Sequence, residues 1–203
     1  MPLVAIAGIL LLSSAATPGS VSARTPAASV PAVSTGAVVM PKDPRLRRFF
    51  TACLARRPAE VRRLLDGDRS LVNARDGSGL TALLDLAPGG DSATAGVLLA
   101  HGADVDRTSA DGFNALHVTC YSGNLGFARV LLDHGAVVDA ASNGGYTPLH
   151  LAAMQNHVAV VRLLLSRNAD INARARSGLT PAAAAARMGS VEAERVLRSR
   201  GGL

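Results

Sequence analysis

Hydrophobic residues fall in short groups that have the spacing of amphipathic helices. Within residues 147–173, one largely apolar group covers 149–153 and a second covers 160–165, and a polar stretch separates the two. Asn168 follows the second group, and an asparagine or glycine at that place can adopt the left-handed conformation that ends a helix. The pattern predicts a hairpin of two short helices followed by a turn.

This pattern recurs with a period of 33 residues. Thr147-Pro148-Leu149-His150 has counterparts in register at Thr81-Ala82-Leu83-Leu84, Asn114-Ala115-Leu116-His117 and Thr180-Pro181-Ala182-Ala183. Two residues before each of these stands a glycine, namely Gly79, Gly112, Gly145 and Gly178. A period of this length predicts a repeat protein in which each hairpin buries its apolar face against the next one.

A 33-residue unit with this residue order resembles the ankyrin repeat. The segment 145–153 reads Gly-Tyr-Thr-Pro-Leu-His-Leu-Ala-Ala, close to the family's G-x-T-P-L-H-x-A-A, and the second-helix motif at 160–173 matches as well. The resemblance covers roughly residues 44–203 and implies an all-α fold, an ankyrin-repeat solenoid of about five helix-turn-helix units with short β-like turns. The units are expected near 44–74, 75–107, 108–140, 141–173 and 174–203.

Three units depart from the motif. The third unit has Asn114-Ala115 in place of Thr-Pro. Pro88-Gly89-Gly90 closes the first helix of the second unit, and since proline and glycine disfavour helix interiors by about 3 and 1 kcal/mol, that helix should be short. The first unit keeps the register without the motif, although Asp43-Pro44 suits a helix start.

Both end units read as polar caps. At one second-helix position the inner units carry Leu99, Leu132 and Leu165, whereas the end units carry Asp66 and Arg198. Since an end unit faces water on one side, the stack is expected to be complete without a partner.

The first residues have a different composition. Leu3 to Leu12 is an unbroken apolar run, and Val21-Ser22-Ala23 follows as a small-residue cleavage site. We interpret residues 1–23 as a secretory signal peptide, because ten apolar residues are too few for a stable span. No Lys or Arg precedes the run, which leaves a mis-assigned start or a short membrane anchor as alternatives. Residues 24–41 read as a flexible linker, and 42–203 as the repeat domain.

Composition and charge refine this picture. The Ala-rich, Arg-over-Lys composition is typical of a GC-rich bacterium, so we expect a periplasmic or secreted bacterial protein. The net charge of +6 is uneven. Residues 24–75 carry eleven Lys/Arg against four acids and residues 162–203 carry eight Arg against three acids, whereas residues 76–161 carry two Arg against eight Asp. Nucleic-acid binders usually concentrate basic residues in one stripe, so we interpret the basic ends as solvated caps.

Export would permit disulfides, but Cys53 and Cys120 lie two repeats apart in this register. Packed helices lie about 8–10 Å apart, which places the two cysteines about 20 Å apart. A disulfide needs Cα atoms within about 7 Å. We therefore predict two free, buried thiols.

No pattern in the sequence predicts catalysis. The resemblance implies that His117 and His150 hydrogen-bond the backbone of their own repeats. His101 and His134 are expected about one repeat apart, too far to share a metal ion, and His157 is expected to cap a helix. Metal-binding, nucleophile-elbow and phosphate-loop motifs do not occur in the sequence. We predict no metal, no cofactor and no enzymatic activity.

Candidate binding residues occur at repeated offsets. The residue before each Thr-like position gives a row of four, which we call the tip row: Leu80, Phe113, Tyr146 and Leu179. Three more residues lie outside the apolar stripes of the first helices. The predicted partner-binding set is Leu80, Phe113, Tyr121, Tyr146, Met154, Gln155 and Leu179. Two interpretations stay open for the row: it packs between neighbouring turn tips, or it forms an exposed apolar strip flanked by Asp111.

The favoured hypothesis is a non-catalytic protein-protein interaction module, a scaffold, inhibitor or stabiliser in an exported compartment. The central acidity favours a partner with a basic surface. We expect a monomer with no small-molecule substrate, no nucleic-acid partner, and membrane contact only through the signal segment. The alternatives are a secreted effector acting on host proteins, and a basic-patch binder of nucleic acid or anionic lipid through the arginines of residues 45–63.

Overall fold

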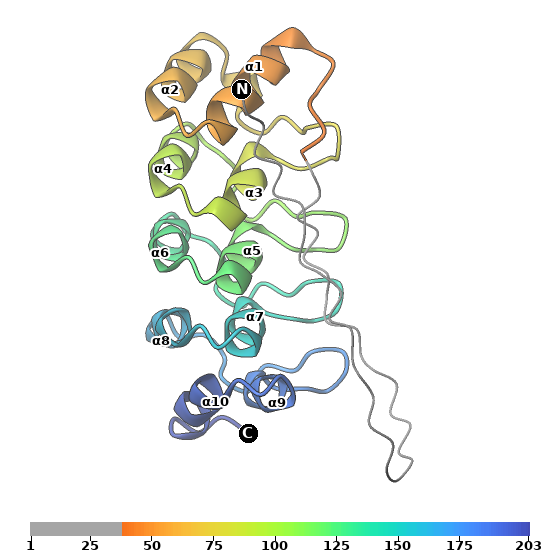
Figure 1. The fold of residues 1–203 in the computed structure, drawn as a ribbon, viewed down its shortest axis with the longest axis vertical. Coiled ribbons are helices and arrows are strands. Elements are labelled where there is room, and N and C mark those ends of the chain that lie inside the picture. Colours follow the sequence, from red (N-terminus) through yellow and green to blue (C-terminus); the bar gives the residue numbers. More distant parts are fainter. Residues whose placement is uncertain (1–37) are drawn as a thin grey trace, which may run out of the picture.

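The computed structural model describes residues 38–203 and consists of stacked helical hairpins (Figure 1). The predicted signal peptide and residues 24–37 of the predicted linker lie outside the described residues. The first helices of the hairpins are α1 (Pro44–Leu54), α3 (Ala82–Leu86), α5 (Ala115–Ser122), α7 (Pro148–Met154) and α9 (Pro181–Arg187). The second helices are α2 (Pro58–Gly67), α4 (Ser92–Ala100), α6 (Leu125–Asp133), α8 (Val158–Ser166) and α10 (Val191–Arg198).

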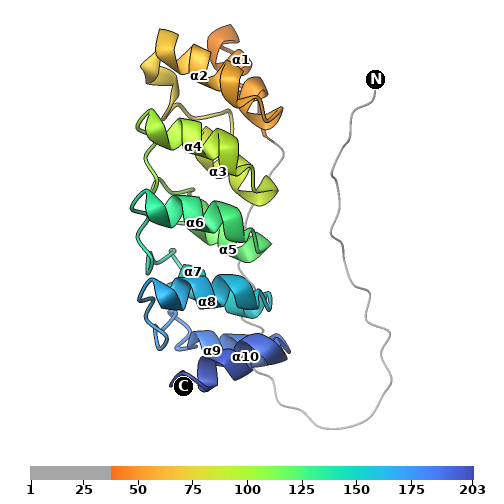
Figure 2. The same ribbon diagram turned by 90° about the vertical axis from the view of Figure 1, so that its left-hand side faces the viewer.

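These helices form two parallel columns. Each first helix contacts the first helix of the next hairpin, and the second helices do the same, so that the hairpins stack in one direction (Figure 2). The predicted all-α repeat fold is confirmed: the described residues contain ten α-helices and no strand, only an isolated bridge between Arg75 and Thr81. No helix within residues 38–203 has the length and apolarity that a bilayer span requires.

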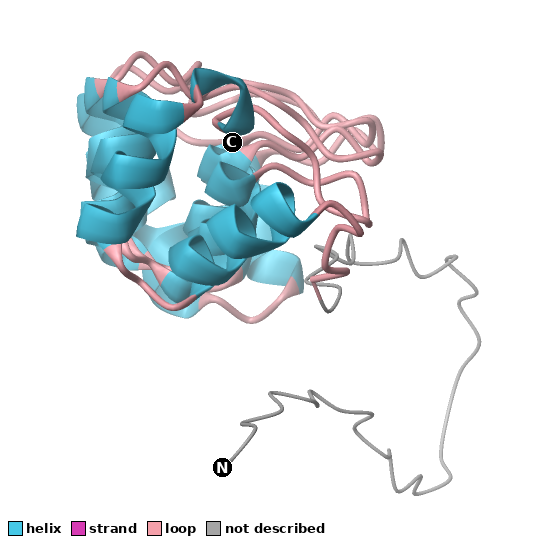
Figure 3. Ribbon diagram, turned by 90° about the horizontal axis from the view of Figure 1, so that it is seen from above, coloured by secondary structure: helices cyan, strands magenta, loops and turns pink. Residues whose placement is uncertain are grey.

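The segments between a second helix and the next first helix project to one side of the columns (Figure 3). We call these four segments, residues 68–81, 101–114, 134–147 and 167–180, the fingers. Three of them begin near a residue with positive φ, as predicted: Gly102, Gly135 and Asn168, which has a φ of 62°. The first finger begins instead at Asp68, whose φ is −151°. The fingers and the first helices together line one face of the stack, which we call the finger face.

Local sequence explains where the helices begin and end. Asp43 accepts a hydrogen bond from the backbone N–H of Arg45 at the start of α1, which satisfies one of the unpaired amides of a helix N-terminus. The predicted shortening of the second unit is confirmed, because α3 has five residues and continues as a 3₁₀ turn, η2 (Ala87–Gly89). A second 3₁₀ turn, η1 (Arg69–Leu71), follows α2.

The main core lies between the two helix columns and runs through every hairpin. Its largest fully buried side chains are Phe49, Phe50, Leu65, Leu83, Leu98, Leu116, Phe127, Leu131, Leu149, Leu164 and Leu197. At the ends of the stack, Arg62, Asp66 and Arg198 are exposed. The end hairpins thus expose charge where inner hairpins carry leucine, alanine or valine.

Polar side chains tie each hairpin to the next at one 33-residue offset. The bonds join Asn73 to Gly102 O and Asp104 N, Asp106 to Val137 N, Asp139 to Asp170 N, and Asn172 to Gly201 O and Leu203 N. The bonds of Asn73, Asp106 and Asp139 satisfy backbone groups of the following finger, and those of Asn172 satisfy backbone groups of the segment after α10. The fingers are therefore held in fixed positions relative to one another.

Neighbouring fingers also approach closely at their tips. The backbone N–H of Arg176 donates to the carbonyl of Gly144 at 2.9 Å. Gly145 has a φ of +74°, and a Cβ there would lie 2.8 Å from Arg176 N. Only glycine fits this position without strain or displacement of the next finger.

Candidate functional site

The face lined by the fingers and the first helices holds all seven predicted binding residues. A second apolar cluster lies here, apart from the main core: Phe113, Tyr146, Leu151, Met154, Ala175 and Ala184, with Tyr121 packed against it. It joins the third, fourth and fifth hairpins. This face therefore has its own packed layer under the fingers.

Burial decides between the two interpretations of the tip row. Phe113 is 5% exposed and Tyr146 9%, so the packing interpretation holds at these two residues of the row. Met154, expected outside the apolar stripe of its helix, is 7% exposed and belongs to the second cluster. The Tyr146 ring packs edge-on against His150 at 5.8 Å between centroids, and Phe113 packs in the same way against His117 at 5.5 Å. Each aromatic ring packs against the first helix of its own hairpin, which removes it from the solvent.

The other predicted residues keep part of their surface. Leu80, Leu179, Tyr121 and Gln155 are half-buried. Leu80 and Leu179 lie on the first and last fingers, and Leu80 packs against the main core. Their partner-binding role stays a prediction.

His117 connects its own hairpin to the next one. Its Nδ1 accepts the backbone N–H of Asn114 at 3.3 Å, and its Nε2 lies 3.0 Å from the carbonyl of Tyr146. A carbonyl can only accept, so Nε2 carries the proton. The bond to its own repeat agrees with the expectation, and the bond to the next finger is an addition that the sequence did not predict.

His150 repeats this arrangement one hairpin further along. Its Nδ1 accepts the N–H of Thr147 at 3.2 Å and its Nε2 faces the carbonyl of Leu179 at 3.0 Å. Burial lowers the pKa of His117 to about 4, and burial also lowers the pKa of His150. Both rings are therefore neutral near pH 7 and act as structural connectors between fingers.

The remaining histidines also make contacts between or within hairpins. His101 Nε2 lies 3.1 Å from a carboxylate oxygen of Asp66 in the preceding hairpin, and His134 contacts only its own helix, at the carbonyl of Val130. His157 is the N-cap residue of α8, but its side chain makes no hydrogen bond to that helix. Its Nε2 instead lies 3.1 Å from the carbonyl of Tyr121 in the last turn of α5, so it caps the end of a helix in the preceding hairpin.

The fingers carry most of the acidic residues of the central repeats. Finger segments 101–114 and 134–147 contain four aspartates against one arginine. The carboxylates of Asp106 and Asp139 accept hydrogen bonds from backbone N–H groups of the next finger, whereas Asp111 is exposed at the tip of its finger. The finger face is thus acidic in its centre.

Asp85 is a polar residue in an apolar position. Its counterparts Val118, Leu151 and Ala184 are all buried, and one of its carboxylate oxygens is buried with no hydrogen-bond partner among the described residues. Burial, with a smaller contribution from Asp76, raises its pKa to about 7. The 33-residue register could have identified Asp85, since no other unit has an acid at that offset.

Both cysteines are free and buried, as predicted. Burial raises the pKa of the Cys53 thiol to about 12 and raises that of Cys120 as well. Neither is a thiolate near neutral pH, so neither has the reactivity of a nucleophile. Within residues 38–203, no three His, Cys, Asp or Glu side chains come together in a way that could hold a metal ion.

Comparison with known proteins identifies the repeat. Residues 86–175 match the family described as ankyrin repeats (3 copies). The matched range begins within α3 and ends in the finger before α9. No curated protein matches the chain.

Proposed function

Residues 86–175 are ankyrin repeats, and on that basis we propose that the chain is a monomer that binds another protein at the finger face. Ankyrin repeats indicate a protein-protein interaction module, in a family that is generally non-catalytic. The proposed role is that of a scaffold, inhibitor or stabiliser. The choice of this face rests on its rigidity: hydrogen bonds from histidine side chains to backbone carbonyls fix the fingers, and a buried aromatic layer supports them.

A fixed surface suits recognition, because a binding face that is already ordered loses less conformational entropy on binding. The half-buried Leu80, Tyr121, Gln155 and Leu179 offer apolar and polar contact area on it. The aspartates of the central fingers give this surface negative charge. We therefore propose a partner that presents a basic surface to the finger face, by complementarity of charge.

Charge reversal at Asp111 tests the proposed face. Asp111→Arg should weaken binding of the affinity-purified partner at least tenfold, because it replaces an attractive charge by a repulsive one at an exposed finger tip. The dissociation constant is measured by biolayer interferometry with the full chain. Glu192→Arg makes the same change at an exposed site on α10 and should leave the constant within about twofold. Equal effects of the two variants would contradict the finger face as the binding site.

We further propose that the chain is exported to the periplasm or secreted. The support is the apolar run Leu3–Leu12 followed by Val21-Ser22-Ala23, which has the order of a signal peptide. N-terminal sequencing of the protein from a periplasmic fraction should give a mature chain that begins at Arg24. A full-length chain recovered only from the cytoplasm would refute export.

A further inference from the structure

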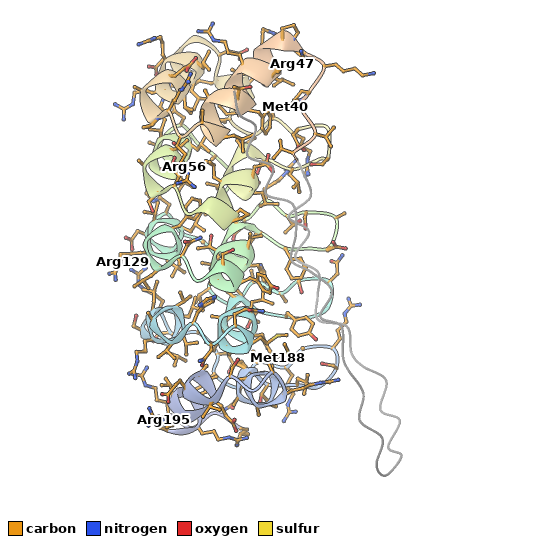
Figure 4. The ribbon with its side chains drawn as sticks, in the orientation of Figure 1. Met40, Arg47, Arg56, Arg129, Met188 and Arg195 are labelled. Carbon is orange, nitrogen blue, oxygen red and sulfur yellow. The ribbon has the colours of Figure 1, made fainter. Side chains whose placement is uncertain are left out.

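A small cleft opens at the end of the stack formed by the first hairpin. It has a volume of about 260 Å³, and its walls come from α1 and from the start of α2: Pro44, Arg47, Arg48, Thr51, Ala52, Arg57 and Glu60. Figure 4 labels Arg47 on α1, at the end of the stack that no other hairpin of the described chain covers. The cleft is smaller than the roughly 300–1,000 Å³ of pockets that hold drug-sized ligands, so it suits a small charged group.

Three guanidinium groups and one carboxylate line this cleft. Glu60 has one oxygen 3.6 Å from Arg48 Nε and the other 3.4 Å from Arg57 Nη1. Both are single contacts at long distances, unlike the paired short bonds of a bidentate arginine-carboxylate contact. Arg47 Nε donates to the carbonyl of Pro41 at 3.3 Å, and this bond leaves its charge uncompensated.

The cleft therefore has an excess of about two positive charges and many unused donors, since each guanidinium carries five N–H groups. An end cap that needs charge only for solubility has no reason to bring arginines together in one cleft, because like charges repel. By contrast, planar guanidinium groups from two helices match the oxygens of a tetrahedral oxyanion.

We propose that this cleft binds a small doubly charged oxyanion, a phosphate or sulfate group, through Arg47, Arg48 and Arg57. Glu60 occupies the place of that anion in the free protein and holds Arg48 and Arg57 near it. When the oxyanion enters, these two arginines exchange Glu60 for the ligand oxygens. The site lies on the cap of the stack, away from the fingers that carry the proposed protein-binding face.

Calorimetric titration of the full chain with inorganic phosphate at low salt tests the site. The double variant Arg48→Gln/Arg57→Gln should lower the affinity at least fivefold. The control Arg62→Gln/Arg63→Gln removes the same charge from exposed positions of α2 that do not line the cleft, and it should change the affinity less than twofold. Circular dichroism checks that each variant is folded. Equal loss in both double variants, or no binding to the wild-type chain, would overturn the proposal.

Removal of the internal carboxylate gives an opposite expectation. Glu60→Gln should tighten phosphate binding about threefold or more, because the ligand no longer competes with a resident negative charge. Asp66→Asn removes an acid from the same helix outside the cleft and should have a smaller effect. A parallel titration with glycerol phosphate separates free phosphate from a phosphomonoester. If the ester binds more tightly than inorganic phosphate, the group attached to the phosphate occupies the rest of the cleft. Weaker binding of Glu60→Gln than of the wild type would contradict the exchange of Glu60 for ligand.

Discussion

Replacing Asp85 by valine is expected to make the protein more stable by about 1–3 kcal/mol at neutral and alkaline pH, the range measured for burial of an unpaired polar group. The substitution removes a buried carboxylate oxygen that has no partner among the described residues. It installs the residue found at the equivalent position 118, which is 6% exposed. The free energy of unfolding is measured by urea denaturation followed by far-UV circular dichroism.

The stabilisation should depend on pH in a defined direction. The pKa of Asp85 is raised to about 7 from an ordinary value of 3.8, so the folded chain holds this proton more tightly than the unfolded chain does. Between about pH 4 and pH 7 the wild type therefore loses stability as the pH rises, and above about pH 7 the whole cost is present. The difference between Asp85→Val and wild type should be largest near pH 8 and smallest near pH 4.

Comparing the two proteins at each pH removes the contribution of the buried histidines, which both contain. Asp111→Val, the same change at an exposed finger tip, is the control and should give no such gain. A difference between Asp85→Val and wild type that stays constant from about pH 5 to pH 8 would mean that Asp85 does not change its protonation there.

The hairpins could be predicted from sequence because their determinants are local and periodic. The apolar groups fix which face of each helix is buried. Asn168, with its positive φ, substitutes for glycine at a turn, and Pro88 limits α3 to five residues. Each of these effects depends on residues a few positions apart, and the 33-residue register repeats them.

The surface of the candidate site was harder to predict, since it depends on contacts between hairpins. The sequence left open whether Phe113 and Tyr146 face water, because the answer depends on where the neighbouring fingers lie. Those positions are fixed by bonds between residues about 30 apart, such as Asn73 with Asp104. The bond from His157 to Tyr121 also joins two hairpins and could not be predicted for that reason. A histidine beside a helix start suggests capping of that helix when only its own helix is considered.

The largest loss of stability is expected from His117→Ala. The side chain is fully buried and bonds both the N–H of Asn114 and the carbonyl of Tyr146. Its removal leaves the buried N–H of Asn114 without a partner, leaves the Tyr146 carbonyl with only its bond from Ser142 N–H, and opens a cavity between two hairpins, for a combined cost of about 3–5 kcal/mol. Urea denaturation of the variant and the wild type measures this loss.

His134→Ala is the matched control, because His134 is exposed and bonds only the carbonyl of its own helix residue Val130. It should cost less than about 1 kcal/mol. The pKa of His117 is lowered to about 4 in the folded chain from 6.5, so this residue makes the wild type lose stability as the pH falls from about 6.5 to about 4. His117→Ala should therefore be both less stable at neutral pH and less sensitive to acid. A loss no larger than that of His134→Ala would show that the fingers do not depend on this histidine for their positions.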